Sequence, residues 1–479
     1  MDNATQKFNM SKKHPVCFEQ LIRHRWHCAA LASLCFLVPG KIHGADTNQV
    51  GADTLRQVLE RLERDEAEIK SLKAQLAKQA SLVPLATNSS DSLLQLRVEK
   101  DEAQLKDLQT QLNGSQAEAL KPKYPSIQFH GFGDFDYAAD NRKYPPGAAP
   151  TSTGVTALGK PNTFYEGELD LFATAQIADN MSFTMEPVLS AGLNNYMGID
   201  LERTYFEYRG SDYFNFDVGR VHTALGYYNT TFHHGDWLQT AIGRPTVVQF
   251  EDSGGILPVH LTGVSLYGAI PSGHMNLNYR LEIGNGLDYS SNPNVNAVQQ
   301  AVSFSDSKAV NLALTSRPEG LPGLQFGAGL YYDLITPDLA SDHIAGEPYS
   351  LPGNNQLIPN AHIVFHNARW QLYNEFYLIH DQPKGGTAHD NPAFFTEVSR
   401  KFGVLTPYAR FTYYHIQSDD LLYALAWAGG VNSGVHYGPS VGLRYDFTDY
   451  AAFKAQYDYL IDSGVNDASR ITLQLCFTF

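Results

Sequence analysis

The chain has 479 residues and a formal net charge of −15; aromatic residues make up 12% of it, with 27 Tyr, 26 Phe and 39 Gly. This acidic balance argues against a nucleic-acid partner, because phosphate groups are bound by basic surfaces. The sequence has no run of about 18 apolar residues, which excludes a transmembrane helix. A search for long apolar runs does not detect transmembrane β-strands, in which apolar and polar residues alternate.

Residues 1–45 have the order of parts typical of a secretory signal peptide. Two arginines precede an apolar stretch from Cys28 to Val38, and small residues follow up to Ala45. The apolar stretch is too short to span a bilayer, so we expect cleavage and export. Three of the four cysteines lie in this segment, so the mature chain would keep only Cys476 and no intramolecular disulfide.

Residues 46–123 are predicted to be a periplasmic coiled-coil segment and linker. From Thr54 to Leu120 the composition shifts to Leu, Glu, Lys, Gln and Ala, and Pro84 interrupts the pattern. A narrow apolar seam on a charged helix is stable only against partner helices, which favours a parallel oligomer. A solvated amphipathic helix or a hairpin that folds on itself also fits. The seam positions are Leu55, Val58, Leu62, Ile69, Leu72 and Leu76, then Leu94, Val98, Leu105, Leu108 and Leu112.

From residue 124 to the end, apolar and polar residues alternate with period two, as strands with one lipid face and one water face require. In the last strand Ile471, Leu473 and Leu475 alternate with Thr472 and Gln474. A soluble sandwich would alternate too, but with turns of similar length at both ends. Sixteen candidate strands begin near Ile127, Phe164, Met181, Asp200, Tyr213, Leu261, Met275, Ala309, Leu324, Leu357, Trp370, Phe394, Leu405, Tyr437, Tyr450 and Ile471.

The connections between these strands alternate between short turns and long loops. The long loops are expected near 139–162, 191–198, 223–260, 285–306, 335–356, 381–391, 417–435 and 463–468. An even strand count with short turns on one side is the signature of a bacterial outer-membrane barrel. We therefore predict an all-β transmembrane barrel of about 16 antiparallel strands over residues 124–479, which would enclose an aqueous channel.

Strand parity also predicts which charged side chains line the channel, because a charge facing lipid is costly. Opposed acidic and basic walls would order water and pass small polar solutes. The alternative is that these residues merely pair across neighbouring strands. The predicted pore-lining residues are Asp134, Asp136, Glu166, Glu168, Asp170, Glu186, Arg280, Arg410, Arg444, Lys454 and Arg470.

The chain resembles Gram-negative outer-membrane porins, in particular the phosphate-selective O/P-like and DcaP-like groups with a coiled coil before the barrel. The resemblance rests on the signal, the heptads, the opening strand Ile127–Tyr137, the stretch Phe216–Arg220 and the terminal Phe479. It implies a homotrimer in which the third long loop, here the longest, folds inward and narrows the pore. The residues expected on this constriction loop are His233, His234, Asp236, Arg244, Glu251 and Asp252.

The charge balance departs from that of a phosphate channel. From Tyr124 onward there are 18 Lys and Arg against 35 Asp and Glu, a difference of −17. Phosphate selectivity would need a basic constriction, so we do not carry it over from the resemblance. We also expect no cofactor and no metal site, since the adjacent histidines of the loop lack a metal-binding spacing.

The predicted function is an outer-membrane porin, a passive diffusion channel for small hydrophilic solutes or ions. Its partners would be outer-membrane lipid, the other subunits of a homotrimer and its solutes, with peptidoglycan as a candidate partner of the coiled coil. A structural tether between outer membrane and cell wall is one alternative. A barrel enzyme is another, but no nucleophile motif supports it.

Overall fold

The computed structural model describes residue 106 and residues 124–141, 162–191, 197–232, 234–251, 255–288, 298–299, 303, 307–335, 353–424, 433–463 and 467–479. The chain divides into two units, Met1–Ala119 and Leu120–Phe479, and the second is described below. The predicted signal peptide lies outside the described residues, and so does the predicted coiled coil apart from Lys106. The same holds for the loop residues His233 and Asp252.

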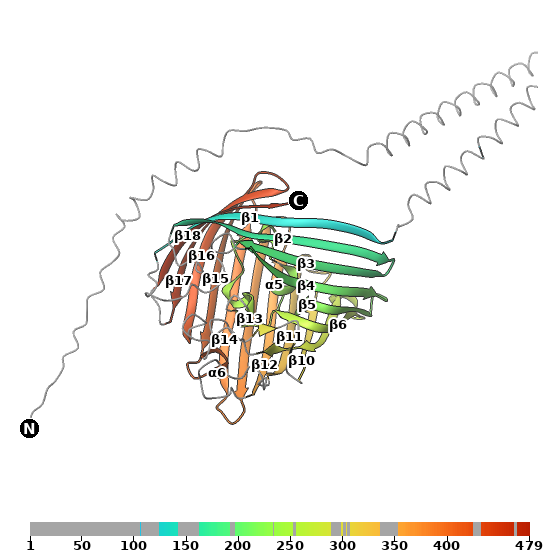
Figure 1. Ribbon diagram of the computed structural model, residues 1–479. Coiled ribbons are helices and arrows are strands. Elements are labelled where there is room, and N and C mark those ends of the chain that lie inside the picture. Colours follow the sequence, from blue (N-terminus) through green and yellow to red (C-terminus); the bar gives the residue numbers. More distant parts are fainter. Residues whose placement is uncertain are drawn as a thin grey trace, which may run out of the picture. The chain divides into compact units, whose positions relative to one another are not determined.

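Sixteen antiparallel strands of the described residues form a closed barrel, as predicted (Figure 1). Each strand pairs with its neighbours along the chain, and β1 pairs with β18 to close the barrel. Closure leaves no strand edge unpaired, which a hydrocarbon surface requires. The barrel strands are β1 (Ser126–Asp140), β2 (Thr163–Ala178), β3 (Met181–Ala191), β4 (Met197–Arg209), β5 (Asn215–His222), β6 (His260–Ile270), β7 (Leu277–Asn285), β10 (Ala309–Ser316), β11 (Leu324–Ile335), β12 (Asn354–His366), β13 (Trp370–Pro383), β14 (His389–Arg400), β15 (Leu405–Ile416), β16 (Gly434–Asp446), β17 (Ala451–Asp462) and β18 (Ala468–Thr478).

A few short elements lie in the connections. The strands β8 (Leu287–Asp288) and β9 (Val298–Gln299) form a separate two-stranded sheet, so β7 pairs directly with β10. The pattern did not predict this sheet, because two residues are too few to establish a period. The helical turns are α5 (Tyr228–Thr231), η3 (Asp236–Leu238), η4 (Thr246–Val248), η6 (Gly273–Met275) and α6 (Leu421–Ala424). Among the described residues, no helix is long and apolar enough to cross a bilayer.

The predicted alternation sorts the side chains between the two faces of the barrel wall. In β13, for example, the Phe376 ring is 48% exposed while Glu375 beside it is 2% exposed. The same contrast recurs around the barrel in the neighbour pairs Phe135 and Asp136, Val218 and Asp217, Leu312 and Asn311, Ile363 and His362, Val441 and Ser440, and Leu475 and Gln474. Apolar side chains therefore cover the outside, and polar ones line the inside.

Some long loops are shorter than predicted because their strands run further. The loop expected at 381–391 shrinks to 384–388, since β13 and β14 stay paired as far as Asp381 and His389. Beyond the hydrocarbon both faces of a strand can be polar, so the alternation that marks a strand disappears there.

An irregularity in the pairing of β1 with β2 changes which side chains point inward. Between β1 and β2 the register shifts, so that Phe135 pairs with Glu166 and Asp136 pairs with Tyr165. Because Phe135 is an outward, exposed residue, Glu166 shares the outer face and is not on the inner wall where parity had placed it. A β-bulge reverses the alternation on one side of itself, and simple counting along the sequence cannot see it.

Candidate functional site

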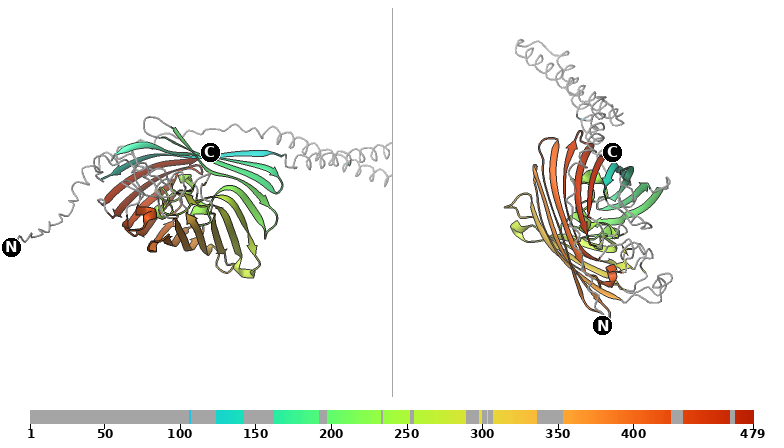
Figure 2. Two further views of the ribbon diagram at one scale, coloured as in Figure 1. Left: turned by 60° about the horizontal axis from the view of Figure 1, so that its bottom comes forward. Right: turned by 90° about the vertical axis from the view of Figure 1, so that its left-hand side faces the viewer.

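The connection between β5 and β6, residues 223–259, folds into the barrel; we call it the inward loop. Figure 2 shows this segment within the ring of strands. Its apolar residues, among them Tyr228, Val248 and Phe250, belong to one buried cluster with inward residues of β11 to β15 such as Ile358 and Phe395. The apolar residues of the loop thus pack against the inner wall.

Cations on the inner wall hold the backbone of the inward loop. Arg410, Arg444 and Lys454, three of the residues expected to line the channel, each donate hydrogen bonds to loop carbonyl oxygens. Such bonds to a charged donor are worth about 1.5–3 kcal/mol each. The acceptors are the carbonyls of Gly243 (2.8 Å) for Arg410, Trp237 (2.7 Å) and Gln239 (2.8 Å) for Arg444, and Asp236 (2.6 Å) and Ala241 (3.2 Å) for Lys454.

Buried acids of the wall accept hydrogen bonds from the beginning of the loop. Glu375 on β13 accepts the backbone N–H groups of Tyr228 (2.7 Å) and Tyr227 (3.2 Å). Gly226 allows this close approach: its φ is +76°, and a Cβ there would lie 2.0 Å from a Glu375 carboxylate oxygen. Glycine is therefore the residue that fits at this contact. Parity on β13 would have assigned Glu375 to the lumen, but nothing in the sequence showed that it binds the loop.

Cationic side chains of the wall donate hydrogen bonds to carbonyl oxygens of the loop, and acidic side chains of the wall accept them from its N–H groups. These hydrogen bonds satisfy backbone groups of the loop that would otherwise be buried without partners, and they fix the loop to the wall. Three basic residues predicted to line the channel, Arg410, Arg444 and Lys454, are consequently engaged by the protein itself.

A histidine of the inward loop ties it to the wall formed by β2 and β4. The His234 Nδ1 lies 2.6 Å from Glu168 Oε2, and its Nε2 lies 2.6 Å from Glu202 Oε1. Burial disfavours the charged imidazole, but the two carboxylates outweigh it and raise the pKa of His234 well above its usual value. Nearby, the Asp236 carboxylate accepts a hydrogen bond from the Gln474 amide (2.5 Å).

Arg244 holds the loop internally, and Glu251 holds its junction with β6. The Arg244 guanidinium donates to the carbonyls of Val248 (2.7 Å) and Phe232 (3.0 Å) and lies over the Phe250 ring at 4.2 Å. Glu251 accepts from the backbone N–H of His260 at 3.0 Å.

Several predicted pore-lining residues form ion pairs across the wall, which is the alternative considered above. Arg410 pairs with Glu397 and Arg470 with Asp140 on adjacent strands, and Arg280 on β7 reaches Asp217 on β5, two strands away. Glu186 contacts Arg203, a residue that parity had not selected. Asp134, Asp136 and Asp170 also face the interior, and the last is fully buried.

Open space remains at the end of the barrel that carries the short turns. A cavity of about 550 Å³ lies there, lined by Glu207, Arg209, Gly210, Ser211, Asp212, Asn215 and Tyr267. Its polar and charged lining suits water and hydrated solutes.

No protein-family model matches the sequence, and no curated protein matches it. Among solved structures, the outer membrane channel DcaP of Acinetobacter baumannii is similar with a TM-score of 0.50 and 10% identity, over 75% of this chain and 99% of that one. An anion-selective porin from Comamonas acidovorans gives a TM-score of 0.48 and 12% identity, over 74% and 99%. At such identities the likeness is one of fold: the chain has the sixteen-stranded barrel fold of outer-membrane porins.

Proposed function

We propose that this chain is an outer-membrane channel for the passive diffusion of small hydrophilic solutes or ions. In this proposal residues 1–45 direct export and are removed, residues 46–123 lie in the periplasm, and residues 124–479 form the pore. The outward apolar side chains would contact outer-membrane lipid.

The observation that carries the proposal is the inward loop, fixed by charged hydrogen bonds inside a closed barrel of sixteen strands. A barrel of about this size encloses an aqueous lumen unless something fills it. A loop held by several strands of the wall narrows that lumen to a constriction of constant shape. Diffusion through a constriction selects by size and charge and needs no moving part.

We further propose a preference for cations. Wall cations such as Arg444 and Lys454 are occupied by loop carbonyls, whereas the barrel region carries 35 Asp and Glu against 18 Lys and Arg. The excess negative charge raises the local concentration of cations in the lumen. In this respect the proposal differs from the anion selectivity stated for the Comamonas acidovorans porin.

The test is single-channel conductance of the purified full-length protein in a planar bilayer, with the reversal potential measured under a salt gradient. We expect stepwise openings, often in threes if the coiled coil assembles a homotrimer, and a reversal potential of the sign given by cation permeation. A correctly folded protein that remains silent would contradict the proposal. The tether between membrane and peptidoglycan would then become the leading function, with a barrel enzyme as the weaker alternative.

A further inference from the structure

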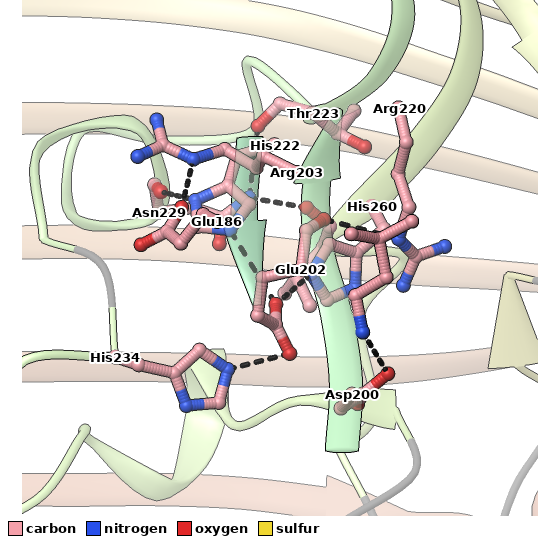
Figure 3. Close-up of polar contacts among 12 residues, drawn as sticks. Glu186, Asp200, Glu202, Arg203, Arg220, His222, Thr223, Asn229, His234 and His260 are labelled. Atoms are coloured by element: carbon pink, nitrogen blue, oxygen red, sulfur yellow. Dashed lines mark hydrogen bonds and ion pairs between the residues drawn. The ribbon is translucent and has the colours of Figure 1, made fainter. Parts of the chain in front are cut away.

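A cluster of ligand-type side chains lies where the inward loop joins the wall, and the proposed channel does not require it. Glu202 on β4, His222 at the end of β5 and His260 at the start of β6 each offer one ligand atom, and these atoms lie within 4.8 Å of one another. The three residues are 1%, 5% and 3% exposed, respectively. Figure 3 shows them grouped together, with His234 reaching the Glu202 carboxylate from another side.

An irregularity in the sheet brings Glu202 to this place. β3 and β4 pair Glu186 with Arg203 and then Pro187 with Leu201, so Glu202 is the extra residue of a bulge. The bulge lets Glu202 and Arg203 both be buried, although strict alternation would turn one of them outward. Bulges that re-aim a side chain are common beside functional sites.

Hydrogen bonds set the ring orientation of both histidines. The His222 Nδ1 lies 3.0 Å from the backbone carbonyl of Asn229, so Nδ1–H donates there and Nε2 carries the lone pair. The His260 Nδ1 lies 2.8 Å from Glu251 Oε2, which accepts its proton in the same way. Both rings therefore direct Nε2 toward Glu202. An oxygen acceptor behind the far nitrogen is the arrangement found around histidine ligands of metals.

We propose that Glu202, His222 and His260 bind a divalent transition-metal ion, with Zn²⁺ as the best match to two imidazoles and one carboxylate. Ligand atoms about 2.0–2.2 Å from tetrahedral zinc lie about 3.3–3.6 Å apart. Glu202 Oε2 is 3.7 Å from His222 Nε2, too far for a hydrogen bond but close to that separation. Glu202 Oε2 is 2.6 Å from His260 Nε2, a hydrogen-bond distance. The bound ion would replace the proton between these two atoms.

The metal would act as a clamp on the inward loop. His222 and His260 are register partners, and they are the residues directly before and after residues 223–259. One ion bound to both would fasten the two ends of the loop to β4. His234 would hold the other oxygen of Glu202, as partners of ligating carboxylates do. Sequence spacing within the loop could not suggest this site, because its ligands come from three separate strands.

The experiment measures zinc binding by the full-length protein in detergent, independently of any channel activity. The protein is stripped with a chelator and titrated with Zn²⁺ against a chromophoric competitor, and bound metal is counted by mass spectrometry. We expect one tightly held ion per chain, and with Co²⁺ in its place the visible absorption of a low-coordinate site. Absence of saturable binding by the unmodified protein would overturn the proposal.

Variants then assign the ligands. His222→Gln should weaken zinc binding by about 100-fold or more. The matched control is His274→Gln: His274 also lies 2.7 Å from a glutamate, Glu319, but its side chain is 93% exposed on a turn. Equal affinity of His222→Gln and the unmodified protein would refute the assignment. If His222→Gln fails to form the barrel, as judged by heat-modifiable gel migration, His222→Cys keeps a zinc ligand and should retain binding.

Discussion

Replacing Lys454 with methionine tests whether the wall cations fix the inward loop. Lys454 is fully buried, and its ammonium group donates to the carbonyls of Asp236 and Ala241 at 2.6 and 3.2 Å. Methionine fills similar space without the charge or the donors. The two lost bonds correspond to about 3–6 kcal/mol if the carbonyls stay dry. Lumen water would rehydrate them in part, which leaves about 2–4 kcal/mol.

A change of about 2–4 kcal/mol shifts the equilibrium between fixed and released loop by about 30- to 700-fold. Hydrogen exchange read by mass spectrometry should show this in peptides covering residues 235–243, including the Ile242 amide that donates to Gln456 at 2.9 Å. Single-channel current should become noisier as the loop moves. Strand peptides far from the loop should keep their exchange rates.

Lys401→Met is the matched control. The Lys401 ammonium lies 3.6 Å from the Asp446 carboxylate and its side chain is 54% exposed, so the pair contributes about 0–1 kcal/mol. The reasoning is refuted if Lys454→Met and Lys401→Met give the same loop exchange and the same current noise as the unmodified protein.

Three further predictions concern the loop contact, the lumen charge and the helical segment. Gly226→Ala should lower the thermal unfolding midpoint more than Gly243→Ala. Both glycines have positive φ, but only at Gly226 would the new methyl group contact the barrel wall. Equal midpoints of the two variants would count against a close contact at Gly226. Asp136→Asn should reduce the cation preference measured by the reversal potential, whereas Asp179→Asn on an exposed turn should not. An unchanged reversal potential in Asp136→Asn would show that this inner acid does not contribute to selectivity. Deletion of residues 54–112 should leave the barrel folded and lower the trimer fraction on gel filtration, while intact trimers with weakened envelope attachment would favour the tether.

The barrel could be predicted from the amino-acid sequence. Alternation of apolar and polar residues predicted sixteen strands, and each begins within five residues of the predicted start. This works because lipid on one face and water on the other impose period two on every strand separately, so no knowledge of the partners is needed. Parity then placed Arg410, Arg444 and Lys454 on the inner wall for the same reason.

The contacts that those side chains make could not be predicted from the sequence. Lys454 binds loop atoms more than 200 residues away, and no local pattern encodes so distant a contact. Bulges moved Glu166 to the outer face and turned Glu202 inward, because one extra residue in a strand reverses the count that parity depends on. Strand pairing and loop docking, rather than residue spacing, therefore brought Glu202, His222 and His260 together.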